Sequence, residues 1–259
     1  MRPLKWMCLI ALLASAAPRP ASAGRPVVIE EFTGTWCVNC YAAGCALDRI
    51  AEEFPRSAVI VLAYHGRDSF HLEINDKRLS LYTVTGYPTV WFNGVFKHVG
   101  GLPITSGEAG ITHMYDQYKS FIAQEQLRTL GVEPFALALN VKSKLVDPSA
   151  VLTIDTTGYP NPVLVQGLMI EDVIPYAATN GQTILNAVVR KDLGTTTVTM
   201  ATHCSKVLNL SSAGLVECCN VRNLHLVVIV QDTVTKEVLG ATGDFGVKNA
   251  ARRDWRLYR

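Results

Sequence analysis

The 259-residue sequence lacks several features that mark common classes of protein. It contains no internal repeat and no low-complexity tract, which excludes solenoid and repetitive architectures. It also has no Gly-rich phosphate-binding loop and no local Ser-His-Asp motif, so nucleotide chemistry and serine hydrolysis are not indicated. After residue 23, no apolar run is long enough to span a bilayer. The mature chain is therefore expected to be a soluble globular protein with no transmembrane segment.

The sequence also lacks an excess of charge of either sign. The sequence has 24 basic and 22 acidic residues, and charged residues make up 18% of it against 49% hydrophobic residues. Three basic residues lie within the first 23 positions, and without them the net charge is about −1. This balance gives no electrostatic reason to expect nucleic acid or an anionic membrane as a partner. The hydrophobic content predicts a buried core, and the length predicts one or two domains.

The first 23 residues have the parts of an export signal. MRPLKW is a short basic start, MCLIALLASAA is an apolar run of 11 residues, and ASA supplies small residues before Gly24. The apolar run is too short to cross a bilayer, and Cys8 lies at its start rather than after it, where the cysteine of a lipoprotein anchor would lie. We therefore expect residues 1–23 to be a cleaved signal peptide. The mature protein is then exported, to the periplasm or cell envelope, in association with the outer membrane or secreted.

Cysteine is scarce, and its positions are informative. After removal of Cys8, six cysteines remain: Cys37, Cys40, Cys45, Cys204, Cys218 and Cys219. An even set in an oxidising compartment is compatible with complete pairing. A disulfide from Cys204 to Cys218 or to Cys219 would close a loop of about 15 residues and add about 3 kcal/mol to the free energy of unfolding. Whichever of Cys218 and Cys219 does not pair with Cys204 would then pair with Cys45 or remain without a disulfide. Cys45, Cys204, Cys218 and Cys219 are therefore candidates for structural disulfides.

Residues 24–131 are predicted to form an α/β domain with a mixed sheet. The expected order is strand, helix, strand, helix, two strands joined by an Asn93-Gly94 turn, and helix. The corresponding segments are 27–32, 42–54, 57–66, 76–84, 85–101 and 113–127. Residues 132–259 instead contain short β-type runs separated by Gly, Pro, Asn and Asp, with no helical pattern between them. They predict a β-sandwich of about seven strands, with the domain boundary at 131–134.

Cys37 and Cys40 follow a predicted strand and precede a predicted helix. At a helix N-terminus, N–H groups and a partial positive charge stabilise the thiolate of the first cysteine. This placement makes Cys37 the nucleophile of a disulfide exchange and Cys40 the resolving thiol. Copper or zinc binding is the rival interpretation, with Cys45 or the cysteines of the second half as further ligands. The Cys-x2-Cys-x4-Cys spacing is not a familiar closed zinc pattern, so no metal or other cofactor is expected.

The strand-WCxxC-helix stretch EEFTGTWCVNC and the later GYPT loop together resemble the thioredoxin fold over residues 27–128. The resemblance implies that Pro88 is a cis-proline beside the disulfide and that Tyr87 offers backbone hydrogen bonds to a substrate near Trp36. It also implies that Glu31 is a buried acid that assists the resolving cysteine. Burial of this carboxyl would raise its pKa and suit it to proton transfer. Strongly oxidising exported relatives often carry a His between the cysteines, whereas Val38 and Asn39 carry no positive charge; this favours a more reducing site and leaves reduction, oxidation and isomerisation all open as the reaction.

The mature chain is also similar to a narrower group, the outer-membrane-protein-28 family of exported bacterial proteins. The matching stretches are VVIEEFTGTWCVNC, AYHGRDSF, YTVTGYPTVWFNG, EDVIPYAATNGQTILNAVVRKDLG and VVIVQDTVTKEVLGA. This resemblance implies a thioredoxin-like domain followed by an immunoglobulin-like β-domain. The sequence departs from the family at Leu185-Asn186-Ala187, where members often carry a His before the VxR segment, here Val188 to Arg190.

The leading hypothesis is an exported thiol-disulfide oxidoreductase whose partners are protein thiol or disulfide substrates and a redox partner protein. Two alternatives are kept. One is a non-catalytic envelope protein that uses the same scaffold for binding or adhesion, and the other is a copper- or zinc-binding protein. His65 and His71 flank an Arg67-Asp68 loop, for which two interpretations are kept: a loop that lines the rim of the active site, or, as the favoured one, a loop with ordinary surface histidines.

Overall fold

The computed structural model describes residues 25–129, 131–218 and 220–245. The predicted signal peptide and Cys219 lie outside the described residues, so the signal and the pairing of Cys219 stay predictions. Within the described ranges, no helix combines the length and apolar character that crossing a membrane requires.

The first half has the element order that the sequence predicts. Its elements are β1 (Val27–Thr33), α1 (Cys40–Glu53), β2 (Val59–His65), α2 (Glu73–Leu81), β3 (Thr89–Phe92), β4 (Phe96–Val99), the short 3-10 helix η1 (Ile104–Ser106) and α3 (Gly107–Arg128). β1 pairs in parallel with β2 and antiparallel with β3, which makes the sheet mixed. Every residue of β1 is buried, as expected for a strand that is covered on both faces.

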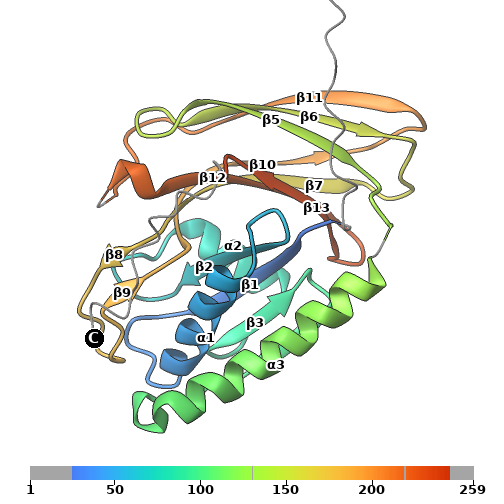
Figure 1. Ribbon diagram of the computed structural model, residues 1–259. Helices are drawn as coiled ribbons and strands as arrows, with labels where there is room; N and C mark the ends of the chain where they lie inside the picture. Colours follow the sequence, from blue (N-terminus) through green and yellow to red (C-terminus); the bar gives the residue numbers. More distant parts are fainter. Residues whose placement is uncertain (1–24, 130, 219, 246–259) are drawn as a thin grey trace, which may run out of the picture.

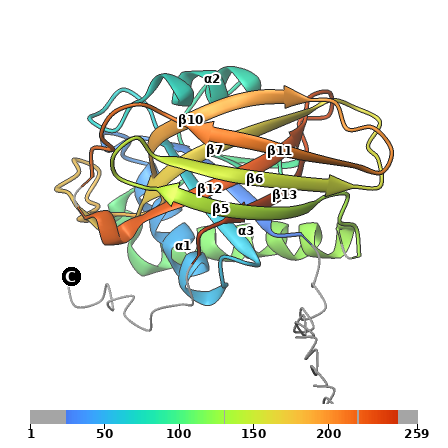
Figure 2. The ribbon, with the colours of Figure 1, turned by 90° about the horizontal axis from the view of Figure 1, so that it is seen from above.

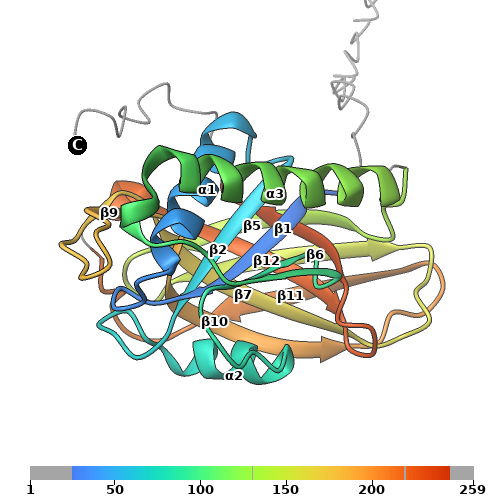
Figure 3. The same ribbon diagram turned by 90° about the horizontal axis from the view of Figure 1, so that it is seen from below.

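Helices cover both faces of this part of the sheet. α1 and α3 pack on one face, in a cluster that contains Ile29, Leu47 and Met114. α2 lies on the opposite face, where Ile74 packs with Phe32 and other side chains of β1 and β2. Figure 3 shows α1 and α3 together on one side of the strands and α2 on the other.

The second half consists of strands. They are β5 (Ala136–Ser143), β6 (Ser149–Thr156), β7 (Val163–Glu171), β8 (Ile174–Pro175), β9 (Ile184–Leu185), β10 (Val188–Val198), β11 (Cys204–Ser211), β12 (Leu224–Asp232) and β13 (Val238–Gly243), with the 3-10 helix η2 (Val221–Asn223) before β12. β5, β6 and β11 form a separate three-stranded sheet that lies over β7, β10, β12 and β13 (Figures 1 and 2). A cluster of buried apolar side chains, such as Leu152, Val165 and Val228, fills the space between the two layers.

The two halves meet in one sheet, which the sequence did not predict. Its strand order is β13-β12-β7-β10-β2-β1-β3-β4, so four strands from each half form eight in a row. The joint is a short parallel pairing of β10 with β2, at Val188 and Ala63. The N–H of Ala63 donates to the carbonyl of Ala187 at 2.8 Å. The chain is thus a mixed α/β protein with a large mixed sheet, and the predicted boundary at 131–134 stays a prediction.

A buried polar network links the halves on the α2 side of the sheet. Nε of Arg78 donates to Glu30 at 2.9 Å, and Nη1 of Arg78 donates to Oε1 of Gln231 at 2.7 Å. The hydroxyl of Tyr82 donates to Glu30 at 2.6 Å and accepts from Nε2 of Gln231 at 2.7 Å. Each charged group is therefore paired and hydrogen-bonded, which is what makes burial of an ion pair tolerable.

Candidate redox site

The cysteine pair lies at the start of α1. Cys37 and Cys40 form a disulfide with a Cα–Cα distance of 5.3 Å. A tight turn leads into the helix, because the N–H of Cys37 donates to Gly34 O and the N–H of Cys40 donates to Cys37 O, both at 3.0 Å. Cys37 is 5% exposed and Cys40 is fully buried. Of the two sulfur-bearing residues, Cys37 is thus the one nearer to the surface.

Trp36, the residue before Cys37, packs against Tyr87. Trp36 is 43% exposed, donates from Nε1 to Gly66 O at 2.8 Å and packs edge-on against Tyr87 with ring centroids 5.6 Å apart. The peptide bond between Tyr87 and Pro88 is cis. Roles for Trp36, Tyr87 and Pro88 in substrate binding stay predictions.

Gly101 brings the Pro88 loop next to the cysteine turn. A Cβ at this position would lie 2.3 Å from the carbonyl oxygen of Asn39 and 2.9 Å from Cγ of Pro88. Only a residue without a side chain fits between these two segments. The site is therefore assembled from the turn before α1, the loop before β3 and the loop after β4.

Glu31 lies on β1 and its side chain is buried. Burial disfavours the charged carboxylate and raises its pKa to about 8; the negative charge of Asp48 adds to the rise, and a hydrogen bond with Thr33 opposes it. Among the described residues, Oε1 of Glu31 has no hydrogen-bond partner. A pKa of about 8 leaves most of the carboxyl protonated at neutral pH and a smaller fraction as a carboxylate that can accept a proton, and one of its oxygens has no hydrogen-bond partner among the described residues.

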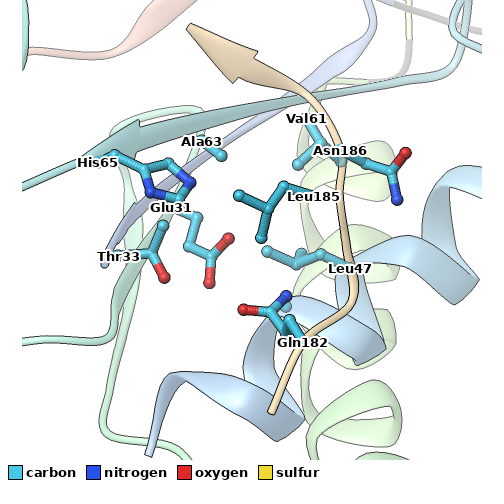
Figure 4. A pocket seen from close by; sticks show the side chains of 10 residues that line it. Glu31, Thr33, Leu47, Val61, Ala63, His65, Gln182, Leu185 and Asn186 are labelled. Carbon is cyan, nitrogen blue, oxygen red and sulfur yellow. The ribbon is translucent and has the colours of Figure 1, made fainter. Parts of the chain in front are cut away.

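A small cavity of about 20 Å³ lies beside Glu31 and has room for about one water molecule. Ten residues line it: Glu31, Thr33, Gly44, Leu47, Val61, Ala63, His65, Gln182, Leu185 and Asn186. Figure 4 shows that Gln182, Leu185 and Asn186 come from a single segment that closes one side of the cavity. Gly44 is one helical turn after Cys40 on α1, so the cavity also borders the helix that starts at the resolving cysteine.

The closing segment belongs to the second half of the chain. It is the β8–β9 hairpin, which reaches beside the first half in Figure 1. The N–H of Asn180 and the hydroxyl of Thr179 both donate to the carbonyl of Thr35, at 3.0 and 3.1 Å. Gln182 approaches α1 so closely that a Cβ at Gly44 would lie 2.5 Å from its Nε2. The second half thus holds the backbone two residues before Cys37.

The resemblances to the thioredoxin fold and to the outer-membrane-protein-28 family assigned no role to these residues. Asn186, which stands in the segment that departs from the family pattern, donates from Nδ2 to Asp48 at 2.9 Å and accepts from the N–H of Val173 at 2.9 Å. The segment was visible in the sequence only as a match to a family, with no chemical motif. Its position beside Glu31 depends on the joint between β2 and β10.

His65 corrects the sequence interpretation, because it is 3% exposed and is not a surface histidine. Its Nδ1 is 2.8 Å from Oδ2 of Asp68. Burial would raise the pKa of Asp68, but hydrogen bonds from His65 and from the N–H groups of Thr35 and Phe70 bring it below its ordinary value. Asp68 is therefore ionised, and it holds both the ring and the turn before Cys37. His71, in contrast, is partly exposed and pairs with an exposed aspartate.

The remaining cysteines lie in different parts of the molecule. Cys45 packs against the cluster beneath α1 and α3, and Cys204 and Cys218 pack against the core between the two β-layers. Within the described ranges no disulfide joins these three to one another. The pairing predicted for them and for Cys219 stays a prediction. The described residues also contain no group of three or more His, Cys, Asp or Glu side chains arranged to hold a metal ion.

The fold and site together define a mixed α/β protein with a disulfide at a helix start. No family model and no curated protein matches the chain. Among solved structures it is similar to HBP35 of Porphyromonas gingivalis, with a TM-score of 0.65 and 14% identity over 86% of this chain and 75% of that one. It is also similar to a protein of Agrobacterium tumefaciens, with a TM-score of 0.53 and 19% identity over 89% and 97% of the two chains.

These likenesses concern the fold alone. A domain of the outer membrane lipoprotein Omp28 from Porphyromonas gingivalis aligns with a TM-score of only 0.28, at 14% identity over 43% of this chain and 87% of that one. That score is too low to support an argument, so membership of the outer-membrane-protein-28 family stays a prediction.

Proposed function

We propose that the protein is an exported thiol-disulfide oxidoreductase that acts on protein disulfides through Cys37 and Cys40. The observation that carries this proposal is the disulfide at the start of α1, with the buried, proton-bearing Glu31 on the adjoining strand. Residues 24–131 would then form a thioredoxin-like domain, and residues 132–259 an immunoglobulin-like β-domain. The export-signal pattern of residues 1–23 supports a location in the cell envelope or outside the cell.

In the proposed reaction, the reduced protein starts with Cys37 as a thiolate and Cys40 as a thiol. The Cys37 thiolate attacks one sulfur of a substrate disulfide, forms a mixed disulfide and releases the other sulfur as a thiolate. Cys40 then gives its proton to the carboxylate form of Glu31 and attacks Cys37. This step breaks the bond to the substrate and forms the Cys37–Cys40 disulfide. Two electrons pass from the dithiol to the substrate, and the dithiol of a redox partner protein returns them.

The surface around Cys37 supports a protein substrate. Trp36 and Val38, the neighbours of Cys37 in sequence, are 43% and 60% exposed. Exposed apolar groups beside a reactive atom offer a contact area to an unfolded or extended chain. The backbone of Tyr87, next to the cis peptide bond, is proposed to align that chain against the disulfide.

Insulin reduction in the presence of a thiol donor tests the proposal. The mature protein is expected to accelerate the reduction, and Cys37→Ser and Cys40→Ser are each expected to abolish the acceleration. Cys204→Ser serves as the control, because Cys204 packs against the core of the β-layers rather than near α1. Wild-type protein without any effect on insulin, or cysteine variants that act like wild type, would refute the assignment.

The alternative, a non-catalytic envelope binding protein, is favoured by one observation. Cys40 is fully buried and Cys37 nearly so, which also suits a bridge that never opens. Structural disulfides of secreted proteins have reduction potentials below about −300 mV, whereas exchange-active ones are easier to reduce. A potential of the 37–40 pair measured against glutathione or dithiothreitol therefore separates the two functions.

A further inference from the structure

A second titratable side chain shares the cavity with Glu31. His65, on β2, and Glu31, on β1, both line the space that has room for about one water molecule. Figure 4 shows the imidazole ring beside the Glu31 side chain, with no other side chain drawn between them. Resolution of the mixed disulfide needs an acceptor for the Cys40 proton, and the cavity walls determine where this proton can move beyond Glu31.

The position of His65 is fixed by Asp68. Because Asp68 is ionised and accepts from Nδ1, the neutral ring carries its proton on Nδ1 and has Nε2 as an acceptor. Nδ1 faces Asp68 at 2.8 Å, and Nε2 lies on the other side of the ring. Asp68 thereby fixes the orientation and the tautomer of the ring. The pair is thus built to receive a proton on the side away from Asp68.

We propose that His65, held by Asp68, is the second proton acceptor of the redox site and receives through one water molecule the proton that Glu31 takes from Cys40. The inference rests on the disulfide exchange proposed above. As Cys40 attacks Cys37, its proton moves to Glu31, a proton moves from Glu31 to the water, and one moves from the water to Nε2. The electron pair of the broken bond leaves with the substrate thiolate. Glu31 is then a carboxylate again, and the two electrons have gone to the substrate disulfide.

Other charged groups near the pair are few. Asp48 from α1 and Tyr118 from α3 interact electrostatically with Glu31, and Asp68 interacts with His65. The hairpin that closes the cavity contributes only the neutral amides of Gln182 and Asn186. Among the described residues that line the cavity, Glu31 and His65 are therefore the two that can exchange a proton.

A single-turnover experiment tests the relay. Reduced protein is mixed with a disulfide-bonded peptide, and the decay of the mixed disulfide is followed between pH 5 and pH 9 in H2O and D2O. His65→Gln is expected to slow the decay about 100-fold, the lower end of what a positioned proton acceptor contributes. It is also expected to change the pH profile and the solvent isotope effect. The matched control is His71→Gln, which removes an exposed histidine that also pairs with an aspartate.

A second measurement needs no substitution of His65. The ring signals of His65 are followed by NMR as a function of pH in the wild type and in Glu31→Gln. If Glu31 and His65 share a proton, the plot of the His65 chemical shift against pH should show an additional step in the wild type that is absent in Glu31→Gln, because coupled groups titrate as a pair. A His65 curve that is the same in both proteins overturns the relay even where His65→Gln fails to fold.

The outcomes separate the relay from the function on which it rests. If the wild type reduces insulin and His65→Gln resolves the mixed disulfide at the wild-type rate, the relay is wrong and the oxidoreductase stands. If the wild type reduces neither insulin nor the peptide, both are wrong. Slow resolution with an altered pH profile in His65→Gln, together with a normal His71→Gln, supports both.

Discussion

At the scale of single residues, Glu31 has the most consequential environment. Its carboxyl lies on a central strand, and burial together with the nearby Asp48 raises its pKa to about 8, so it can both hold and accept a proton near neutral pH. Sequence reasoning identified this residue because it stands six positions before Cys37 in a buried strand. For His65 it favoured a surface position over one at the rim of the active site, because nothing in the local sequence distinguishes a buried histidine at a strand end from an exposed one.

The raised pKa of Glu31 predicts a pH dependence of stability. The folded carboxyl keeps its proton up to about pH 8 and the unfolded one only up to about 4.5, so the folded state binds more protons in between. This contribution to stability is fully present below pH 4.5 and is lost as the pH rises to 8. It amounts to about 5 kcal/mol at 1.36 kcal/mol per pKa unit. In Glu31→Gln, which has no carboxyl at this position, this decrease in unfolding free energy between pH 4.5 and pH 8 is expected to be absent.

Urea unfolding at pH 5 and pH 8 measures this difference. The wild type is expected to lose more unfolding free energy between the two pH values than Glu31→Gln does. Glu52→Gln, on the exposed face of α1, is the control and should retain the wild-type dependence. Equal dependence in the wild type and in Glu31→Gln would show that the carboxyl does not titrate as its burial implies.

At the scale of elements, the position of the β8–β9 hairpin beside the candidate site could not be predicted from the sequence. The helices and strands of the first half follow from periodicity and from the turn residues at Asn93-Gly94, because their contacts are local in sequence. The hairpin instead forms hydrogen bonds with Thr35, which precedes it by more than 130 residues in the sequence. These bonds come from a backbone N–H and a side-chain hydroxyl, and no periodic pattern predicts them. Its residues Gln182 and Asn186 complete the cavity, so part of the candidate site was unpredictable from local sequence.

Removal of the Asn180 side chain is expected to loosen this hairpin. Asn180 is buried, accepts from the N–H of Gln182 at 3.0 Å and donates to its Oε1 at 2.9 Å. Asn180→Ala should cost about 1–3 kcal/mol, because it leaves buried polar groups unsatisfied. It should also speed amide exchange in the hairpin.

Hydrogen-exchange mass spectrometry of peptides around residues 33–36 and 176–187 measures the effect. Asn161→Ala is the matched control: Asn161 donates one hydrogen bond to Asp232 and lies in the loop before β7. Unchanged exchange in both peptides of Asn180→Ala would mean that the side chain does not hold the hairpin in place.

At the scale of the whole molecule, one sheet runs through both halves. The second half has two layers, of four and three strands, and its four-stranded layer continues into the sheet that carries the cysteine pair. The sequence could not reveal this, because the joint is a single short pairing of β2 with β10. The buried network of Glu30, Arg78 and Gln231 adds a second connection.

The halves are therefore expected to unfold together. Tryptophan fluorescence, to which Trp36 and Trp91 of the first half contribute, and far-UV circular dichroism should give one coincident transition in urea. Arg78→Leu leaves Glu30 as an uncompensated buried charge and should destabilise this transition by about 3–5 kcal/mol. The control is Lys119→Ala, which breaks an exposed ion pair with Glu53 and should cost at most about 1 kcal/mol. Two separate transitions in the wild type would contradict a shared folding unit.

The pairing of β2 with β10 also sets an order of events when the chain is made. Val188 follows Ala63 by 125 residues, and synthesis at about 5–20 residues per second needs roughly 6–25 s to cover that distance. Throughout this interval one edge of β2 has no strand beside it, and open edges attract other chains. We expect the nascent first half to depend on a chaperone, or to stay unfolded, until β10 has emerged.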